Sequence, residues 1–259
     1  MSVEPTCSAQ GRAHRFRNPV DPSPRRSRWY FAAKRLFDIV GAVTALIIAM
    51  PLFAMVAVAI VADSRGPIFY RAIRVGRHGR PLRMLKFRKM HVNAHGGPLT
   101  TARDSRFTRV GRFLTRTRLD ELPQLWHVLR GDMSFVGPRP ESPEFVATRP
   151  AQFAEILTMR PGIAGFSQLA YADEVKILSL EDPVRQYIER ILPEKCALDR
   201  LYARTASVGA DSRILIWTLV TVLLRRPVAV DRATGTLRLR VRPGMAILVG
   251  RASADSPST

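Results

Sequence analysis

The longest apolar run in the chain covers residues 39–62, which hold no charged side chain. A helix needs about 20 apolar residues to cross the hydrocarbon core of a bilayer. The length of the run therefore favours a membrane helix over a buried core helix. Lys34 and Arg35 precede the run, and an aromatic stretch at residues 29–31, of a kind typical of a membrane interface, precedes these two residues.

A proline interrupts this run near its middle. Pro51 removes one backbone hydrogen bond and bends a helix. Basic residues flank the run on both sides, which does not fit a simple span under the positive-inside rule. We therefore expect a re-entrant helix that enters the cytoplasmic leaflet, breaks near Met50 and Pro51, and returns. A straight, kinked span is the alternative, because prolines also occur in ordinary membrane helices.

The shorter patterns predict a mixed α/β domain with more helix than strand. Alternating runs around Gly76 and Gly79 predict a hairpin. Apolar positions within residues 119–129 recur at helical spacing. We expect Asp120 to cap that helix and Gly131 to end it.

Further segments complete this outline. Residues 160–165 predict a tight turn, and residues 214–224 form an apolar run too short to span a membrane. We expect an amphipathic element near 211–224 to lie in the membrane interface or on the domain. Helical periods occur over residues 143–158, interrupted at Pro150, and over 183–192 and 194–206.

Charge narrows the classes of partner. The chain of 259 residues carries 41 Lys and Arg against 21 Asp and Glu, a net charge of +20. This excess indicates a polyanion: nucleic acid, an anionic membrane face or phosphorylated substrates. Most of the basic residues are arginine, which suits phosphate recognition but is also typical of a GC-rich genome. Residues 64–103 contain no acidic residue. The 46% hydrophobic content excludes a disordered or collagen-like chain.

The two cysteines do not indicate a disulfide or a metal site. Cys7 and Cys196 are far apart, and no Cys-x-x-Cys or Cys/His cluster has metal-ligand spacing. A disulfide scaffold and a structural zinc site are therefore not expected, and a reducing compartment fits best.

Six motifs in order resemble one family, the monotopic phosphoglycosyl transferases of bacteria, also called bacterial sugar transferases, in their short form. The resemblance covers roughly residues 34–225. The motifs are Lys-Arg-Leu-Phe-Asp (34–38), Gly-Pro-Ile-Phe-Tyr-Arg (66–71), Lys-Phe-Arg-Lys-Met (86–90), Leu-Asp-Glu-Leu-Pro-Gln-Leu (119–125), Gly-Asp-Met-Ser-Phe-Val-Gly-Pro-Arg-Pro (131–140) and Arg-Pro-Gly-Ile-Ala-Gly (160–165).

The resemblance implies a reaction. Family members move a sugar 1-phosphate from a UDP-sugar to a polyprenyl phosphate, usually undecaprenyl phosphate, and release UMP. This step begins the synthesis of O-antigen, capsule, exopolysaccharide or glycoprotein glycans. An Asp-Glu pair and Mg²⁺ carry the chemistry, with a covalent phospho-sugar on the Asp, and the membrane segment is re-entrant.

Carried onto this sequence, the pattern makes Asp120 the nucleophile and Glu121 the Mg²⁺ ligand. Taken alone, Asp120 also fits a capping residue and Glu121 a residue that favours the helix dipole. The expected phosphate-binding residues are Lys86, Arg88, Arg116, Arg139 and Arg160. A solvated loop residue is an equal alternative for Arg160.

The chain departs from the family pattern at three places. Many members have a basic residue where Thr115 stands, so either the neighbouring Arg116 replaces it or that phosphate contact is lost. His127 occupies a position that is usually Asn. Ala170 and Ala172 stand where some members have an arginine, which puts a basic contact to the nucleotide there in doubt.

We expect the protein on the cytoplasmic face of the bacterial inner membrane, in contact with membrane lipid. Nucleic acid is not an expected partner, because the 64–103 stretch has few aromatic residues and an apolar run has no use there. An inactive membrane scaffold of the same fold is the second alternative. The sugar, the glycan pathway and the oligomeric state stay open. The expected parts are a disordered basic tail (1–33), the re-entrant helix (34–62), the catalytic domain (63–225) and a C-terminal extension with a short strand pair (226–259).

Overall fold

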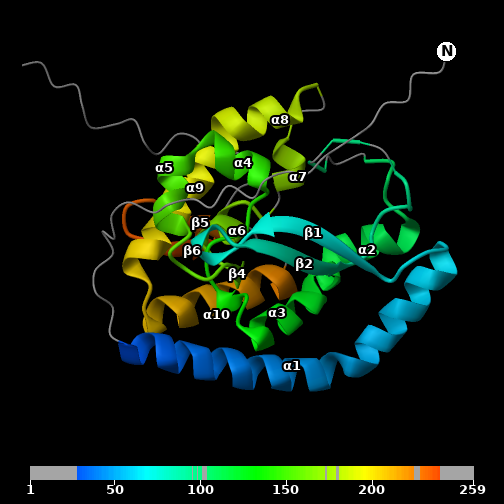
Figure 1. The fold of residues 1–259 in the computed structure, drawn as a ribbon, viewed down its shortest axis with the longest axis horizontal. Helices are drawn as coiled ribbons and strands as arrows, with labels where there is room; N and C mark the ends of the chain where they lie inside the picture. Colours follow the sequence, from blue (N-terminus) through cyan, green and yellow to red (C-terminus); the bar gives the residue numbers. More distant parts are fainter. Residues whose placement is uncertain are drawn as a thin grey trace, which may run out of the picture.

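A computed structural model describes residues 28–94, 96–97, 99–100, 104–172, 174–178, 181–224 and 228–239. The chain is a helix-rich α/β unit resting on one long helix, α1 (Figure 1). The expected fold class, mixed α/β with more helix than strand, is confirmed. Of the expected tail, residues 1–27 lie outside the described residues. The helix already begins at Arg28, ahead of the expected start at Lys34.

The elements follow one another through short connections. The first half of the described chain contains α1 (Arg28–Asp63), β1 (Phe69–Val75), the 3₁₀ turn η1 (Arg77–Gly79), β2 (Pro81–Phe87), α2 (Arg109–Thr117), the 3₁₀ turn η2 (Leu119–Gln124), α3 (Leu125–Arg130) and β3 (Ser134–Val136). The second half contains α4 (Pro143–Thr148), α5 (Pro150–Ile156), β4 (Gly162–Ala164), α6 (Phe166–Ala170), α7 (Glu174–Ile177), α8 (Pro183–Gln186), the π-helical turn η3 (Tyr187–Ile191), α9 (Leu192–Thr205), α10 (Val208–Leu224), β5 (Val228–Val230) and β6 (Leu237–Leu239).

Helix α1 continues through Pro51 instead of breaking there. Figure 1 shows it bending along its length, from the dark-blue first part to the light-blue second part. A single proline removes one backbone bond, which bends a helix without ending it when the neighbouring turns are intact. Within the described chain, α1 alone is long and apolar enough to cross a membrane, and 11% of its most apolar window is buried.

The first half of α1 is fastened to the domain by polar side chains. The Arg35 guanidinium donates to the carbonyl oxygens of Val128 and Leu129 at 2.6 and 2.7 Å, which satisfies the C-terminal end of α3. The buried Asp38 carboxylate accepts from the Ser134 hydroxyl at 3.1 Å and from the Phe135 backbone N–H at 3.0 Å. These bonds explain why charged residues stand immediately before the apolar run.

The last turn of α1 is fastened to the same domain. The Asp63 carboxylate accepts from the Val110 backbone N–H at 2.9 Å, at the N-terminus of α2. The Arg88 guanidinium donates to the carbonyl oxygens of Ser64 and Arg65 just beyond the helix. Both ends of α1 are therefore bonded to one globular unit, while its middle offers exposed apolar side chains.

Three two-stranded sheets lie within the described residues. Strands β1 and β2 form the expected antiparallel hairpin, with Phe69 opposite Phe87. The expected tight turn at 160–165 instead contains strand β4, which pairs in parallel with β3. Glycines permit this close crossing, because a Cβ atom at Gly162 would lie 2.0 Å from the backbone nitrogen of Gly137.

The predicted helix over 119–129 is two elements, and the expected cap at Asp120 is wrong. Arg118 adopts a left-handed conformation (φ 60°) and ends α2 directly before η2, so Asp120 lies inside the first turn of η2. Pro123 has no N–H to complete an α-helical bond there, which favours a 3₁₀ turn. Gly131 ends α3 with φ 88°, as expected.

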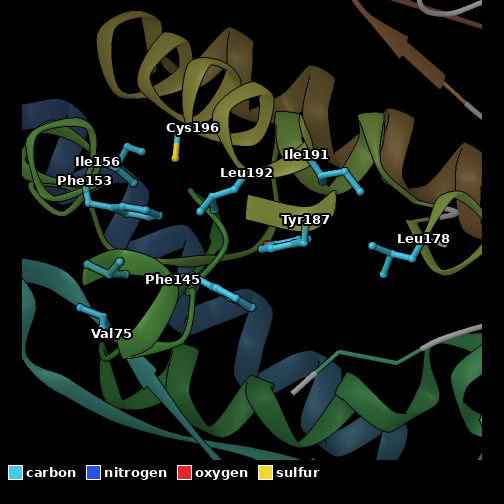
Figure 2. Close-up of a cluster of buried hydrophobic side chains, with 10 residues drawn as sticks. Val75, Phe145, Phe153, Ile156, Leu178, Tyr187, Ile191, Leu192 and Cys196 are labelled. Carbon is cyan, nitrogen blue, oxygen red and sulfur yellow. The ribbon is translucent and has the colours of Figure 1, made fainter. Parts of the chain in front are cut away.

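A buried apolar cluster joins the hairpin to the C-terminal helices (Figure 2). The rings of Phe145 in α4 and Tyr187 in η3 pack in a tilted arrangement, with centroids 4.6 Å apart. Leu192 and Cys196 of α9 face Phe153 of α5 across the same cluster. This packing holds α9 behind the loop that follows β3.

The C-terminal part adds a helix and a hairpin. Helix α10 starts earlier than the apolar run predicts and exposes a row of large apolar side chains. Beside α6, strands β5 and β6 form the expected strand pair. The remainder of the expected extension, residues 226–227 and 240–259, lies outside the described residues.

Candidate active site

Two adjacent carboxylates lie in η2 beneath strand β2. Asp120 is buried, with 3% of its surface exposed. The Lys89 ammonium lies 3.6 Å from its Oδ2 atom. A buried carboxylate is stable only when cations or donors surround it, so the surroundings of this pair decide its charge.

Glu121 lies between two further cations. Its Oε1 atom accepts from the Lys86 ammonium at 3.0 Å and from the Arg139 guanidinium at 3.1 Å. Burial alone would raise the pKa of Glu121, but Lys86, Arg139 and Arg118 together hold its pKa well below the usual value. The carboxylate of Glu121 raises the pKa of Arg139 in turn. Glu121 is therefore ionised throughout the physiological range.

Four chain segments bring these charges together. Strand β2 presents Lys86 on the face toward η2 and ends at Phe87, and the next turn carries Lys89 to Asp120. The Gly-Pro-Arg-Pro loop after β3 carries Arg139, and the left-handed turn after α2 carries Arg118. The motifs that are far apart in sequence thus converge on one site.

Arg88 does not join this cluster. Its guanidinium is occupied by the Ser64 carbonyl at 2.6 Å and the Arg65 carbonyl at 2.7 Å. The family pattern implied a phosphate-binding role for Arg88, but strand β2 ends at Phe87, and Arg88 beyond it bonds to other neighbours. Phosphate binding by Arg88 stays a prediction, and in this structure the side chain binds the end of α1.

Of the two arginines near the end of α2, the unexpected one lies at the site. Arg116 is exposed and forms no hydrogen bond or ion pair with any described residue. Arg118 donates to the Ala172 carbonyl, and its charge lowers the pKa of Glu121. Arg118 thus connects the Asp-Glu pair to the segment in which the chain departs from the family pattern.

Arg160 lies apart from the carboxylates. Burial lowers the pKa of Arg77, and the charge of Arg160 lowers it further. Within the described chain, Arg160 pairs with neither Asp120 nor Glu121. Its role as a phosphate ligand stays a prediction.

Sequence reasoning missed Lys89 and Arg118. Lys89 belongs to the Lys-Phe-Arg-Lys motif, from which the family pattern selected Lys86 and Arg88 and not Lys89. Arg118 directly precedes the Leu-Asp-Glu motif, and only its left-handed backbone turns it toward Glu121.

His127 supports the strand that carries Lys86. Its Nε2 atom accepts from the Leu85 backbone N–H at 3.1 Å, and its Nδ1 atom lies 3.3 Å from Asp132. This pairing requires the neutral ring with its proton on Nδ1. An imidazole here links β2 to the loop after α3, so the departure from Asn leaves a polar bridge in place.

The carboxylate pair can also meet the needs of Mg²⁺. Among the described residues, nothing hydrogen-bonds to Oδ1 of Asp120 or Oε2 of Glu121, and no group of three or more His, Cys, Asp or Glu side chains could hold a metal. Mg²⁺ commonly takes one or two carboxylates and completes its shell with substrate phosphates and water. Two adjacent carboxylates, each with one free oxygen, fit that requirement only when a phosphorylated substrate is bound.

Comparisons with known proteins identify the family of this chain. The model of the family "Bacterial sugar transferase" matches residues 29–225. The chain is 35% identical over 195 residues to a UDP-glucose:undecaprenyl-phosphate glucose-1-phosphate transferase of Caulobacter vibrioides, covering 73% of this chain and 69% of that protein.

Two other relatives are much longer than the matched segment. An undecaprenyl-phosphate glucose phosphotransferase of Komagataeibacter xylinus is 33% identical over 77% of this chain and 37% of its own length. A UDP-glucose:undecaprenyl-phosphate glucose-1-phosphate transferase of Escherichia coli (strain K12) is 39% identical over 72% of this chain and 39% of its own length. The match to the family model, which covers most of the chain, shows that this protein belongs to the bacterial sugar transferase family.

Proposed function

We propose that this protein is a phosphoglycosyl transferase that moves a sugar 1-phosphate from a UDP-sugar to undecaprenyl phosphate and releases UMP. The observation that carries the proposal is the pair formed by the buried Asp120 and the partly buried Glu121, surrounded by Lys86, Lys89 and Arg139. Such a site attracts a phosphorylated substrate and holds a carboxylate nucleophile against it. The names of the relatives, UDP-glucose:undecaprenyl-phosphate glucose-1-phosphate transferases among them, support the same donor and acceptor classes.

Asp120 is the nucleophile in this proposal. A carboxylate oxygen attacks the sugar-linked phosphorus of the UDP-sugar, and the bond from that phosphorus to the bridging oxygen breaks. UMP leaves with the electron pair, and an acyl phosphate joins Asp120 to the sugar phosphate. An oxygen of undecaprenyl phosphate then attacks the same phosphorus and frees the carboxylate. The covalent step avoids a direct encounter between two anionic substrates.

The surrounding residues divide the remaining work. Lys89 lies beside Asp120 and neutralises the phosphoryl oxygens as they approach, while Arg139 offers a guanidinium that binds phosphate oxygens through two hydrogen bonds. Glu121 would hold Mg²⁺ through its free oxygen, which leaves the free oxygen of Asp120 for the attack. The ion supplies charge neutralisation for the diphosphate and the leaving UMP.

We further propose that α1 is a re-entrant membrane anchor on the cytoplasmic face of the inner membrane. Both ends of α1 are bonded to one globular unit, at Asp38 and Asp63, and Pro51 lies at the apolar middle. A domain on one side of the bilayer then holds both helix ends on that side. The exposed apolar sides of α1 and α10 would contact lipid and keep the site at the depth of a lipid phosphate.

The test is UMP release by the detergent-solubilised full chain from a panel of UDP-sugars. We expect release with one or more donors that depends on undecaprenyl phosphate, Mg²⁺ and Asp120, and that disappears in Asp120→Asn. The panel also identifies the sugar. Equal release by wild type and Asp120→Asn, or no release with any donor, would instead favour a membrane scaffold of this fold.

A further inference from the structure

A second buried charge cluster lies behind the Asp-Glu pair and takes no part in the proposed chemistry. Lys195 of α9 is 4% exposed. Its ammonium lies 3.1 Å from Glu141, 3.0 Å from Glu174 and 2.9 Å from the Tyr187 hydroxyl. The Tyr187 hydroxyl also donates to Glu141 at 2.8 Å. We call these four residues the Lys195 cluster.

The Lys195 cluster adjoins the arginine of the active site. Glu141 follows Arg139 in the same loop, separated from it by one proline. Glu121 contributes most to raising the pKa of Arg139, and Glu141 and Glu174 add to it. The Arg139 guanidinium thus bonds to Glu121 at 3.1 Å while the cluster carboxylates are near enough to act on its charge.

Two carboxylates against one lysine leave the cluster with a single excess negative charge. If Lys195 were absent, Glu141 and Glu174, whose side chains are 11% and 23% exposed, would lose their cation while still largely shielded from water. Because an unpaired buried charge is strongly unfavourable, they would draw in the nearest mobile cation. Arg139, two residues before Glu141 in the same loop, is a cation on which both carboxylates already act.

We propose that Lys195 is a positioning residue that occupies Glu141 and Glu174 and so leaves the Arg139 guanidinium free to bind the donor diphosphate beside Glu121. This role rests on the proposed function, because Arg139 is a donor ligand only in that reaction. Lys195 itself touches neither Asp120 nor Glu121 in the described structure.

The proposal predicts opposite effects from neighbouring substitutions. Lys195→Met keeps the length of the side chain and removes its charge, so Arg139 turns to the carboxylates. The KM for the UDP-sugar then rises about tenfold, which corresponds to the loss of one charged hydrogen bond to the donor. Lys195→Met combined with Glu174→Gln removes one competing carboxylate and restores much of the donor KM. Glu174→Gln alone lowers the donor KM, whereas a purely architectural contact would make that variant worse.

The matched control is Arg200→Met on the same helix. Arg200 pairs with Glu155 at 2.8 Å on a face away from the site, so its loss removes a cation from α9 without changing the donor KM. The KM for undecaprenyl phosphate and the thermal unfolding midpoint are measured for every variant. A folded Lys195→Met with raised donor KM and unchanged acceptor KM supports the proposal.

Two further outcomes separate the inference from the proposed function. An active wild type in which Lys195→Met leaves the donor KM unchanged, or in which the added Glu174→Gln gives no recovery, overturns the positioning role alone. UDP binding is measured in parallel by calorimetry with the solubilised full chain. A wild type that neither binds UDP nor releases UMP overturns the proposed function together with the inference.

Discussion

The buried carboxyl group of Asp199 gives a sharp test of the electrostatics behind the site. Asp199 lies one turn after Lys195 on α9 and is 3% exposed, and its Oδ1 atom has no hydrogen-bond partner among the described residues. Burial raises its pKa from 3.8 to about 7, against the opposing effects of Ser167 and Lys195. The folded protein therefore keeps a proton on Asp199 at a pH where the unfolded chain has lost it.

The direction and size of the effect on stability follow from this difference. Between the two pKa values the folded state holds one proton more than the unfolded state, so stability falls as pH rises, by about 1.4 kcal/mol per pH unit. From pH 5 to pH 8 most of the change occurs below pH 7. Wild type should lose about 3 kcal/mol over that range through this one group.

Asp199→Asn removes the titration and keeps the shape of the side chain. The free energy of unfolding is measured by urea titration in detergent micelles at pH 5 and pH 8, with tryptophan fluorescence as the signal. We expect the free energy of unfolding of the variant, relative to that of wild type, to be about 3 kcal/mol higher at pH 8 than at pH 5. Comparing the two proteins cancels the other titrating groups. If the free energy of unfolding changed with pH equally in both proteins, the raised pKa of Asp199 would be refuted.

Three shorter predictions concern the anchor and the site. Asp38→Ala leaves the Ser134 hydroxyl and the Phe135 N–H without their acceptor, so the free energy of unfolding in urea should fall by about 3 kcal/mol; an unchanged value would contradict the assigned docking of α1. Pro51→Leu should straighten α1 into a span, so cysteine labelling that still finds both helix ends on one side refutes it. Glu121→Gln should lower UMP release at least about a hundredfold. In wild type, the low pKa of Glu121 should keep this residue ionised below pH 4.5. A loss of wild-type activity near pH 4.5 that is absent in Glu121→Gln would argue against the ion cluster.

Local pattern was sufficient where one segment decides the outcome. The uncharged run at 39–62 predicted the long helix, and the glycines around the first hairpin predicted its turn. The motif Lys-Phe-Arg-Lys did not show which of its basic residues reaches the carboxylates, because that depends on where the strand ends. Strand β2 ends at Phe87, so Lys89 reaches Asp120 and Arg88 binds the end of α1.

Tertiary contacts decided the remainder. No property of residues 160–165 alone distinguishes a tight turn from strand β4, because the strand exists only through its parallel pairing with β3. The cluster around Lys195 likewise joins residues from the loop after β3, from α7, from η3 and from α9. Such contacts between distant segments leave no periodic signal in the sequence.

The covalent role of Asp120 is tested most directly by intact-protein and peptide mass spectrometry. The solubilised full chain is incubated with the UDP-sugar that gives UMP release, with Mg²⁺ and without undecaprenyl phosphate, and is then quenched in acid. The account predicts a mass increase of one sugar phosphate on the peptide that contains Asp120. The increase should vanish when undecaprenyl phosphate is added and be absent in Asp120→Asn. Full UMP release with no adduct on wild type, or an adduct on another residue, would contradict it.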